Sequence, residues 1–525
     1  MQNQKLVSPV LIMLVGFSMS IQSEIKPISQ VQTKKSFYGA LLADCKPYEV
    51  WHFFEEISQI PRGSGNEKAV GDFVANIAKS KQLEVVRDSI GNVIVRKPAS
   101  SERYAKSPMI TLQSHLDMVC EKNNDVTHDF TKDPIKLVRQ GKYLGAAGTT
   151  LGADNGVGVA MMLSLMTSHD LVHGPLEFLF TVNEEMGFDG ARNLTPASLK
   201  GRILCNLDSE ELGAFFVGCA GGCETVGHVP VKFEPLENSV KGFKIAINGL
   251  KGGHSGADIH LGRVNSLKLL SQILVFLETY NGRLVSLEGG NKRNAIPRYA
   301  EAMVAVTNDK EKVFVNDFKQ FGAMLAEQNK AIEPNLALTI TPVDQPKEAM
   351  KIAHQRTITN LLAMIPHGVI KMSADIESLV ETSSNLARVS LEKESHVVVF
   401  ETSQRSLVAE EKQKISQTVV NHMKRAGAEV VAGGGYPGWK PELNSPTLQT
   451  AQKTYERLFG EKPAVKAIHA GLECGQIGER IPGMDMISFG PSVIDAHSPD
   501  ERVDTETVGI FWKFLTNFLA DMVEK

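Results

Sequence analysis

Apolar side chains in the first part of the chain follow two alternating patterns. Helical spacing of apolar positions, with breakers between the segments, predicts helices at 47–60, 67–83 and 155–166. Stretches that are apolar almost throughout predict buried strands at 109–119, 175–185 and 203–209. A further pair of strands is expected within 83–98, joined at a turn that includes Gly91 and Asn92. Buried strands that alternate with helices indicate an α/β layer with a mostly parallel sheet.

The pattern changes after about residue 215, where the alternation becomes looser and more polar. Such a pattern is typical of a sheet with helices on one face only. The predicted elements are strands at 242–250 and 396–402 and helices at 266–280, near 348–364 and at 407–425. Beyond a Gly/Pro-rich, hinge-like segment at 433–441, the first pattern returns with a strand at 484–490 and a last helix at 506–525.

Composition narrows the class of protein. The chain has 525 residues, which is too long for one ordinary core and predicts two domains. Hydrophobic residues make up 42% and charged residues 22%, the balance of a folded globular protein. A net charge of −4 gives no support for nucleic acid or an anionic membrane as the main partner. Six cysteines in so long a chain do not predict a disulfide scaffold.

The N-terminus carries a separate signal. Lys5 precedes an apolar run at 10–19, which is too short to cross a bilayer but suits the core of a signal peptide. We therefore predict a signal peptide over 1–24, cleaved near 20–24, and a periplasmic or secreted protein. The alternative is a cytoplasmic protein with an N-terminal extension. No later stretch reaches the ~18–20 apolar residues of a transmembrane helix.

Two acidic residues, Glu184 and Glu185, stand side by side directly after the apolar run at 175–180. Neighbouring carboxylates at the end of a buried strand repel each other, which is costly unless a cation binds them.

Other imidazole and carboxylate side chains occupy comparable positions. His115 and Asp117 share one face of a predicted strand, because side chains alternate along it. Asp154 lies in a glycine-flanked turn before a helix, Asp208 follows another strand, and His497 lies in a late polar loop. The carboxyl ends of parallel strands converge on the crevice where open α/β sheets bind ligands.

Imidazoles and carboxylates are ligands that zinc accepts. The chain offers more of them than one ion needs, so a carboxylate that bridges two ions makes a two-metal site the economical interpretation. In this interpretation Glu185 binds a metal ion and Glu184 accepts a proton from water. Any one of these residues alone is more often a cap or a hydrogen-bonded turn residue, so the prediction rests on their joint occurrence.

These residues lie in motifs that resemble those of the aminoacyl-histidine dipeptidases, also called cytosol nonspecific dipeptidases. That family belongs to the co-catalytic zinc peptidases, in which a lid domain interrupts the catalytic domain. The resemblance runs from about residue 45 to the C-terminus. It is carried by eight motifs in the family's order: SHLDMVCEKN, GTTLGADNGVGVAMM, TVNEEMGFDGA, NLDSE, LKGGHSGADIH, YPGWKP, HAGLECG and AHSPDE.

The resemblance implies a role for each metal-site residue. His115, Asp154 and Asp208 would bind one zinc ion, while Asp154 bridges to a second ion completed by Glu185 and His497. Two further roles are Asp117 as the acid that orients His115 and Glu184 as the general base. A cis peptide bond is expected between Asp154 and Asn155. Other divalent metals such as Co²⁺ or Mn²⁺ can substitute for zinc.

The resemblance also assigns residues of the lid. His254 would stabilise the developing oxyanion at the scissile carbonyl. Asn294 and Arg405 match residues associated with the substrate's C-terminal carboxylate or the tetrahedral intermediate, and Gly471 lines the same pocket. His469 and Glu473 lie in the same motif as Gly471 and receive no role.

We therefore predict an α/β metallopeptidase with catalytic segments at 40–221 and 438–525 and an inserted α+β lid at 222–437. Its substrates would be small unblocked dipeptides, including those that end in histidine. The alternatives are an N-acyl amino acid deacylase on the same scaffold, a zinc aminopeptidase without a lid, and a catalytically inactive binding protein. A homodimer is compatible with the sequence.

Overall fold

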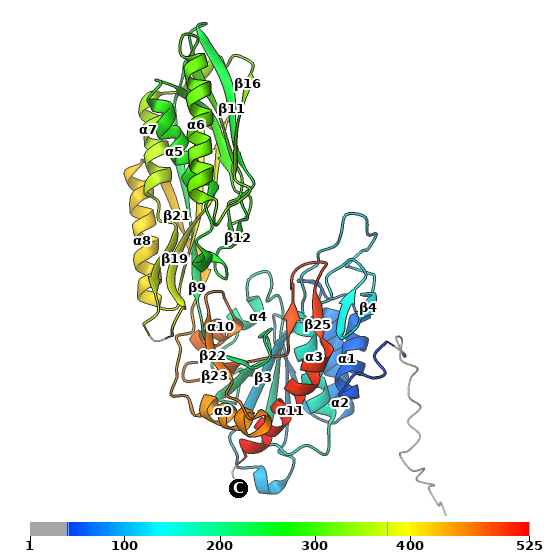
Figure 1. Cartoon of the computed structure of the whole chain (residues 1–525). Coiled ribbons are helices and arrows are strands. Elements are labelled where there is room, and N and C mark those ends of the chain that lie inside the picture. The colour runs from blue at the N-terminus through cyan, green and yellow to red at the C-terminus, as the bar shows by residue number, and fades with distance from the viewer. Residues whose placement is uncertain (1–38, 40, 375, 524–525) are drawn as a thin grey trace, which may run out of the picture.

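The computed structural model describes residues 39, 41–374 and 376–523, which form a broad base and a long projection that rises from it (Figure 1). The base unit contains the elements before Gly221 and after Tyr436. The lid contains the elements from Gly221 to Tyr436. The chain leaves the base unit in β9 (Gly221–Pro230) and returns to it in β21 (Glu429–Tyr436), and these two strands are paired.

An eight-stranded sheet forms the centre of the base unit, in the order β1-β2-β6-β3-β7-β23-β8-β22. Its four middle strands run parallel. The strands are β1 (Glu84–Arg87), β2 (Val93–Lys97), β3 (Ile110–His115), β6 (Leu176–Thr181), β7 (Ile203–Asn206), β8 (Ala214–Cys219), β22 (Ala464–Ile468) and β23 (Asp485–Ser488). Every residue of β3 and β6 is buried, including the polar residues Thr111, Gln113 and Ser114 of β3.

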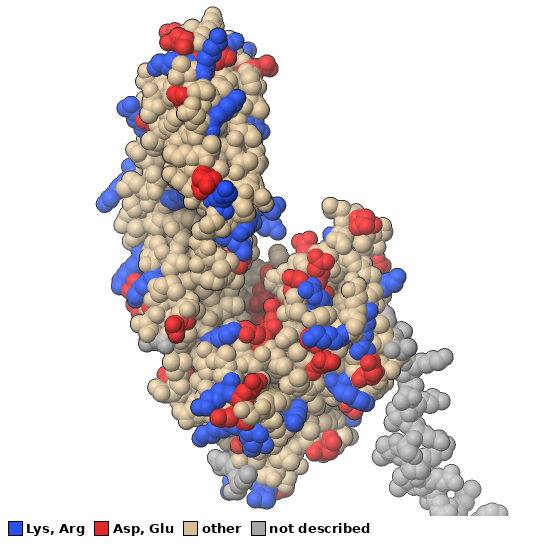
Figure 2. Space-filling view, viewed as in Figure 1, with Lys and Arg blue, Asp and Glu red and all other residues tan. Residues whose placement is uncertain are grey.

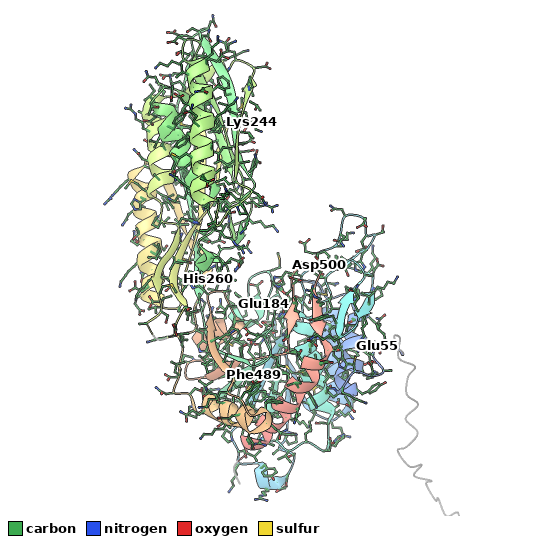
Figure 3. All side chains as sticks on the ribbon, in the orientation of Figure 1. Glu55, Glu184, Lys244, His260, Phe489 and Asp500 are labelled. Carbon is green, nitrogen blue, oxygen red and sulfur yellow. The ribbon has the colours of Figure 1, made fainter. Side chains whose placement is uncertain are left out.

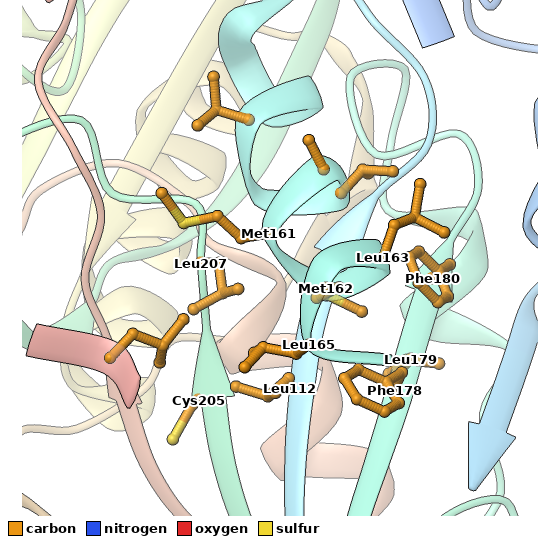
Figure 4. Packing of buried hydrophobic residues seen from close by; sticks show 14 of the residues in the cluster. Leu112, Met161, Met162, Leu163, Leu165, Phe178, Leu179, Phe180, Cys205 and Leu207 are labelled. Atoms are coloured by element: carbon orange, nitrogen blue, oxygen red, sulfur yellow. The ribbon is translucent and has the colours of Figure 1, made fainter. Parts of the chain in front are cut away.

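Helices pack on both faces of this sheet (Figure 1). They are α1 (Tyr48–Ser58), α2 (Lys68–Ser80), α3 (Ala153–Thr167), α4 (Asp189–Arg192), α9 (Pro446–Phe459), α10 (Glu473–Arg480) and α11 (Thr505–Asp521). Helix α3 is buried along nearly its whole length, and its Met161, Met162 and Leu165 belong to one core cluster with Leu112 of β3, Phe178 of β6 and Leu207 (Figure 4). The first turn of this helix, which carries Asp154, is therefore held by the core.

The lid is built on a nine-stranded antiparallel sheet, in the order β16-β11-β15-β13-β19-β20-β9-β21, with β18 also paired to β19. The strands are β9 (Gly221–Pro230), β11 (Val240–Asn248), β13 (Arg283–Gly289), β15 (Ala300–Thr307), β16 (Ala337–Val343), β18 (Gly368–Met372), β19 (Val380–Glu392), β20 (Val397–Ser406) and β21 (Glu429–Tyr436). Four helices cover one face: α5 (Ser266–Glu278), α6 (Glu311–Asn329), α7 (Ile352–Met364) and α8 (Ala409–Arg425). A second apolar core lies between these helices and the sheet.

Three small sheets complete the described chain. The first has the order β24-β25-β5-β4, with β4 (Leu137–Gln140), β5 (Tyr143–Ala146), β24 (Val493–Ile494) and β25 (Arg502–Asp504). The others pair β10 (Phe233–Pro235) with β17 (Glu348–Met350), and β12 (Gly253–His254) with β14 (Ala295–Ile296). Among the described residues, no helix has the length and apolar content needed to cross a membrane.

The predicted fold class is confirmed: a mostly parallel central sheet and an inserted α+β lid. The predicted hinge at 433–441 differs in detail, because Gly433, Gly434 and Gly435 belong to strand β21, whose register shifts between Gly433 and Gly435. The helix predicted near 348–364 is preceded by strand β17 and begins at Ile352. Helix α6 and several lid strands were not predicted.

Candidate active site and metal centre

Three neighbouring parallel strands end at one edge of the base sheet, and the candidate residues follow them there. His115 is the last residue of β3, Asp208 lies two residues after β7, and Glu184 and Glu185 follow β6. Asp154 joins them from the first turn of α3.

The carboxylate of Asp154 lies at the centre of this group. Its Oδ1 is 3.0 Å from Nε2 of His115, and its Oδ2 is 3.0 Å from Nε2 of His497. His115 Nε2 also lies 3.3 Å from Oδ1 of Asp208, and His497 Nε2 lies 3.1 Å from Oε1 of Glu185. Two sets of three side chains therefore share Asp154.

The possible ligand atoms of each set lie within 4.8 Å of one another: His115, Asp154 and Asp208 in one, and Asp154, Glu185 and His497 in the other. A third set of the same compactness combines His115 with Glu184 and Glu185. The shared carboxylate favours the first two sets, because one bridging residue then serves both positions.

The unpaired oxygens of this cluster fit a bound cation. Oε1 of Glu185 and Oδ1 of Asp208 are buried and have no hydrogen-bonding partner, although an imidazole nitrogen lies near each. Buried carboxylate oxygens normally have partners, so these two require an explanation. Imidazole and carboxylate ligands form the donor set that divalent metals such as zinc accept.

The acid–base properties of the cluster point the same way. Burial raises the pKa of Glu184 well above its usual range and that of Asp208 to about 7. The hydrogen bond with Asp154 and the close approach of the Glu185 carboxylate raise the pKa of His497 to about 11. Asp154 is the exception: hydrogen bonds from His115 and His497 outweigh its burial and lower its pKa. These shifts reflect buried carboxylates that repel one another, a charge that bound cations would compensate.

Asp117 lies beneath the cluster and ties its loops together. Its carboxylate accepts hydrogen bonds from the backbone N–H groups of Glu184 (3.0 Å) and Glu185 (3.1 Å) and from the Ser64 hydroxyl (2.7 Å). Nδ1 of His115 lies 3.4 Å from Oδ1 of Asp117 and 3.2 Å from its carbonyl oxygen, so one residue orients the imidazole through two acceptors. Burial opposes ionisation of Asp117, but the hydrogen bonds to its carboxylate lower its pKa to about 2.

Two buried residues that were not predicted also hold this site. The Glu501 carboxylate accepts hydrogen bonds from four consecutive backbone N–H groups, those of Leu151, Gly152, Ala153 and Asp154, at 2.7–3.2 Å. Arg62 donates to the carbonyl oxygens of Leu116, Asp117 and Gly152. Glu501 could have been predicted, because it belongs to the same motif as His497. Arg62 could not, because it lies in a breaker segment between two predicted helices, where no motif marks it. The Asp154–Asn155 peptide bond is cis, as predicted.

A cleft of about 1020 Å³ opens above the cluster, between the base unit and the lid. Acidic side chains line the hollow in the space-filling view (Figure 2), and Glu184 lies where the two units face each other (Figure 3). The cleft is lined by all of the predicted substrate-binding residues: His254, Asn294, Arg405 and Gly471. His469 and Glu473 are buried and lie outside this lining.

His254 is held as a neutral imidazole. Its Nδ1 accepts hydrogen bonds from the backbone N–H groups of Gly256 (3.3 Å) and Ala257 (2.9 Å), so the ring proton is on Nε2. Burial and the neighbouring charge of Arg405 lower its pKa to about 4. Nε2 is therefore available as a hydrogen-bond donor.

Arg405 is distinguished from the other arginines of the cleft by having no acidic partner among the described residues. Arg293 forms ion pairs with two glutamates, and Arg192 lies 3.9 Å from Asp189. Arg405 is 8% exposed, and its Nε is buried without a hydrogen-bonding partner. A buried guanidinium without an acidic partner that lines a cleft has the chemistry to bind an anion.

Comparison with known proteins assigns the chain to a family. Residues 111–521 match the model of peptidase family M20/M25/M40. The chain belongs to this peptidase family. It is 41% identical, over 92% of its length and 99% of the relative's, to the cytosol non-specific dipeptidase of Escherichia coli. The crystal structure of aminoacylhistidine dipeptidase from Vibrio alginolyticus superposes with a TM-score of 0.82, at 37% identity over 92% of this chain and 98% of that one.

A more distant solved structure shares the fold alone. The aminopeptidase PepT from Bacillus cereus gives a TM-score of 0.56 at 16% identity, over 90% of this chain and 98% of that one.

The prediction of an exported protein is wrong. A relative that aligns with 92% of this chain is named for the cytosol, which favours the cytoplasmic alternative. An apolar run of ten residues after a single lysine is a weaker indication than agreement over the length of a relative. The predicted signal peptide at 1–24 lies outside the described residues.

If the cluster binds divalent cations, zinc will stabilise the fold. Protein stripped with a chelator should unfold at a lower temperature than zinc-loaded protein, because each site held at a hundred times its Kd adds about 2.7 kcal/mol. Asp208→Ala should reduce the zinc-induced shift in a calorimetric scan. Asp72→Ala, which removes an exposed carboxylate of α2, is the control and should keep it. Equal melting temperatures with and without zinc would contradict a metal site.

Proposed function

We propose that this protein is a dinuclear zinc dipeptidase that hydrolyses unblocked dipeptides, including those that end in histidine. One observation supports this more than any other. The cleft between base unit and lid is lined on one side by a carboxylate and histidine cluster that could hold metal ions, and on the other by a buried arginine without an acidic partner. Such a cleft suits a short substrate that has its scissile bond at the cluster and its carboxylate at Arg405. The dipeptidase names of two family members agree with this proposal.

We assign the metal ligands from the two sets that share a carboxylate. His115 and Asp208 would hold one ion, Glu185 and His497 the other, and Asp154 would bridge them. When bound, the two zinc ions supply Lewis acidity, which polarises the peptide carbonyl and lowers the pKa of water. Asp117 keeps His115 oriented, and Glu501 holds the N-terminal turn of α3 that carries Asp154.

Glu184 is the proton acceptor in this proposal. It lies next to Glu185 but outside both sets that share Asp154, so its carboxylate is not needed as a ligand. The hydrogen bond from its backbone N–H to Asp117 fixes its place in the loop. It would take a proton from the attacking water and return it to the leaving amine.

The lid supplies the groups that contact the substrate. Nε2–H of His254 would donate to the oxygen of the scissile carbonyl as negative charge develops there. The Arg405 guanidinium would bind the C-terminal carboxylate, and Asn294, which also lines the cleft, would contact this carboxylate or the tetrahedral intermediate. Gly471 would line the pocket through its backbone.

The domain limits belong to this proposal. Strand β8 of the base sheet ends at Cys219 and strand β9 of the lid begins at Gly221, while β21 ends at Tyr436. These positions support a catalytic domain of residues 40–221 and 438–525 and a lid of 222–437. A homodimer stays a prediction.

Replacement of Glu184 by glutamine tests the proton acceptor. Glu184→Gln keeps the size of the side chain, so zinc content should stay unchanged while kcat falls by at least ~10²-fold, the scale of a lost general base. Glu327→Gln, an exposed position on α6, is the matched control and should leave kcat unaltered. Near-normal turnover by zinc-loaded Glu184→Gln would rule out this role.

A substrate panel tests the activity. Zinc-loaded protein should cleave free L-dipeptides such as alanyl-histidine. It should act poorly on peptides of six or more residues, because their C-terminal carboxylate would lie too far from the scissile bond for Arg405 to bind it. Liberated amino acids can be quantified by chromatography, with chelator-treated protein as the blank. Faster hydrolysis of N-acetyl amino acids than of any dipeptide would instead establish the deacylase alternative.

A further inference from the structure

Tyr436 has no role in the proposal so far, although it stands at the meeting point of three segments of the cleft. It is the last residue of lid strand β21 and lines the cleft together with Phe188 and Gly471. Phe188 follows the Glu184–Glu185 loop, and Gly471 precedes helix α10. A residue in this place can relate the lid to the loops of the base unit.

The ring of Tyr436 is held on several sides. It packs edge-on against Phe188, with ring centroids 5.2 Å apart and an interplanar angle of 70°. A Cβ atom added at Gly471 would come within 2.7 Å of the Tyr436 ring, and one at Gly222 within 2.8 Å. Two glycines are thus required for the backbone to approach the ring so closely, which fixes the position of its hydroxyl.

That hydroxyl contacts the guanidinium of Arg405. Nη1 of Arg405 donates a hydrogen bond to the Tyr436 oxygen at 2.5 Å. Nε and Nη2 of Arg405, which form the other edge of the fork, donate no hydrogen bond to a described residue, and Nε is buried. Two parallel N–H groups along one edge are the arrangement that binds a carboxylate bidentately.

The Tyr436 hydroxyl is neutral, so it does not cancel the positive charge of the Arg405 guanidinium. Burial raises the pKa of Tyr436 by more than the neighbouring charge of Arg405 lowers it, so the hydroxyl stays protonated at neutral pH. A neutral acceptor orients the guanidinium without cancelling its charge, whereas a carboxylate in the same place would compete with the substrate. Arg293, on the same cleft, shows the contrast, because Glu224 and Glu401 already neutralise it.

We propose that Tyr436 is a positioning residue for carboxylate recognition: it holds Nη1 of Arg405 so that the Nε–Nη2 edge faces the free C-terminal carboxylate of a dipeptide. This inference rests on the proposed function. In this proposal, Tyr436 and Arg405 of the lid together select dipeptides with a free C-terminus over those with a blocked one. Tyr436 also packs against Phe188, in the loop that follows Glu184 and Glu185.

The substitution Tyr436→Phe removes one oxygen atom and keeps the ring. With zinc-loaded full-length protein, kcat/KM for alanyl-histidine should fall about tenfold, the scale of one hydrogen bond to a charged group, chiefly through KM. For the C-terminal amide of the same dipeptide, kcat/KM should change less than about twofold. Tyr280→Phe, which removes a hydroxyl bonded to Asp317 (2.6 Å) elsewhere in the lid, should change neither.

A double-mutant cycle makes the test independent of activity on the amide. In an Arg405→Ala background, Tyr436→Phe should cause no further loss on alanyl-histidine, because a positioning residue acts only through the group it positions. Additive losses, equal losses on the free dipeptide and its amide, or no loss on either would overturn the proposal. Failure of the wild-type protein to cleave any dipeptide would instead refute the proposed function.

Discussion

The carboxylate of Asp154 is the constraint on which the rest of the site depends. Each of its oxygens faces an imidazole from a different part of the chain, His115 from a central strand and His497 from a loop near the C-terminus. Further carboxylates surround it at the base of the cleft. Burial of so much like charge costs several kcal/mol per ion unless cations and hydrogen bonds compensate. The fold therefore has to hold Asp154 rigidly and supply positive partners.

The fixed position of Asp154 comes from elements that the chain brings together over long distances. Glu501 binds the backbone N–H groups of the turn that carries Asp154. Arg62 donates hydrogen bonds to the carbonyl oxygens of Leu116 and Gly152, and so joins this turn to the segment after β3. Helix α3 is buried in the core along its length, which keeps its first turn, with Asp154, in place at the cluster (Figure 4). The same logic extends to the lid, where a neutral tyrosine orients a buried arginine. In both places a neighbouring residue fixes the position of a charged side chain that lines the cleft.

The sequence was most informative for the central parallel strands, which are rich in apolar residues and end in polar ones. The ends of β3, β6 and β7 could be predicted, and with them the convergence of His115, Glu185 and Asp208, because parallel strands present their carboxyl ends at one edge. It was least informative in strand β19, whose buried residues Thr382, Ser383, Ser384 and Asn385 are polar. Several of these make hydrogen bonds with distant residues, such as that between Ser383 and His469 at 2.7 Å, so no apolar alternation marks the strand. Glu501 and Arg62 escaped prediction for a related reason, since their partners are distant backbone groups rather than side chains with a recognisable spacing.

The location of bound metal tests the central claim most directly. Crystals of the protein grown with zinc can be measured at the zinc absorption edge, so that an anomalous difference map shows each ion by itself. We predict two peaks on either side of the Asp154 carboxylate, one bound by His115 and Asp208 and the other by Glu185 and His497, at about 2.0–2.2 Å from their ligand atoms. The absence of a peak at the cluster, or a single ion bound by His115, Glu184 and Glu185, would contradict the account.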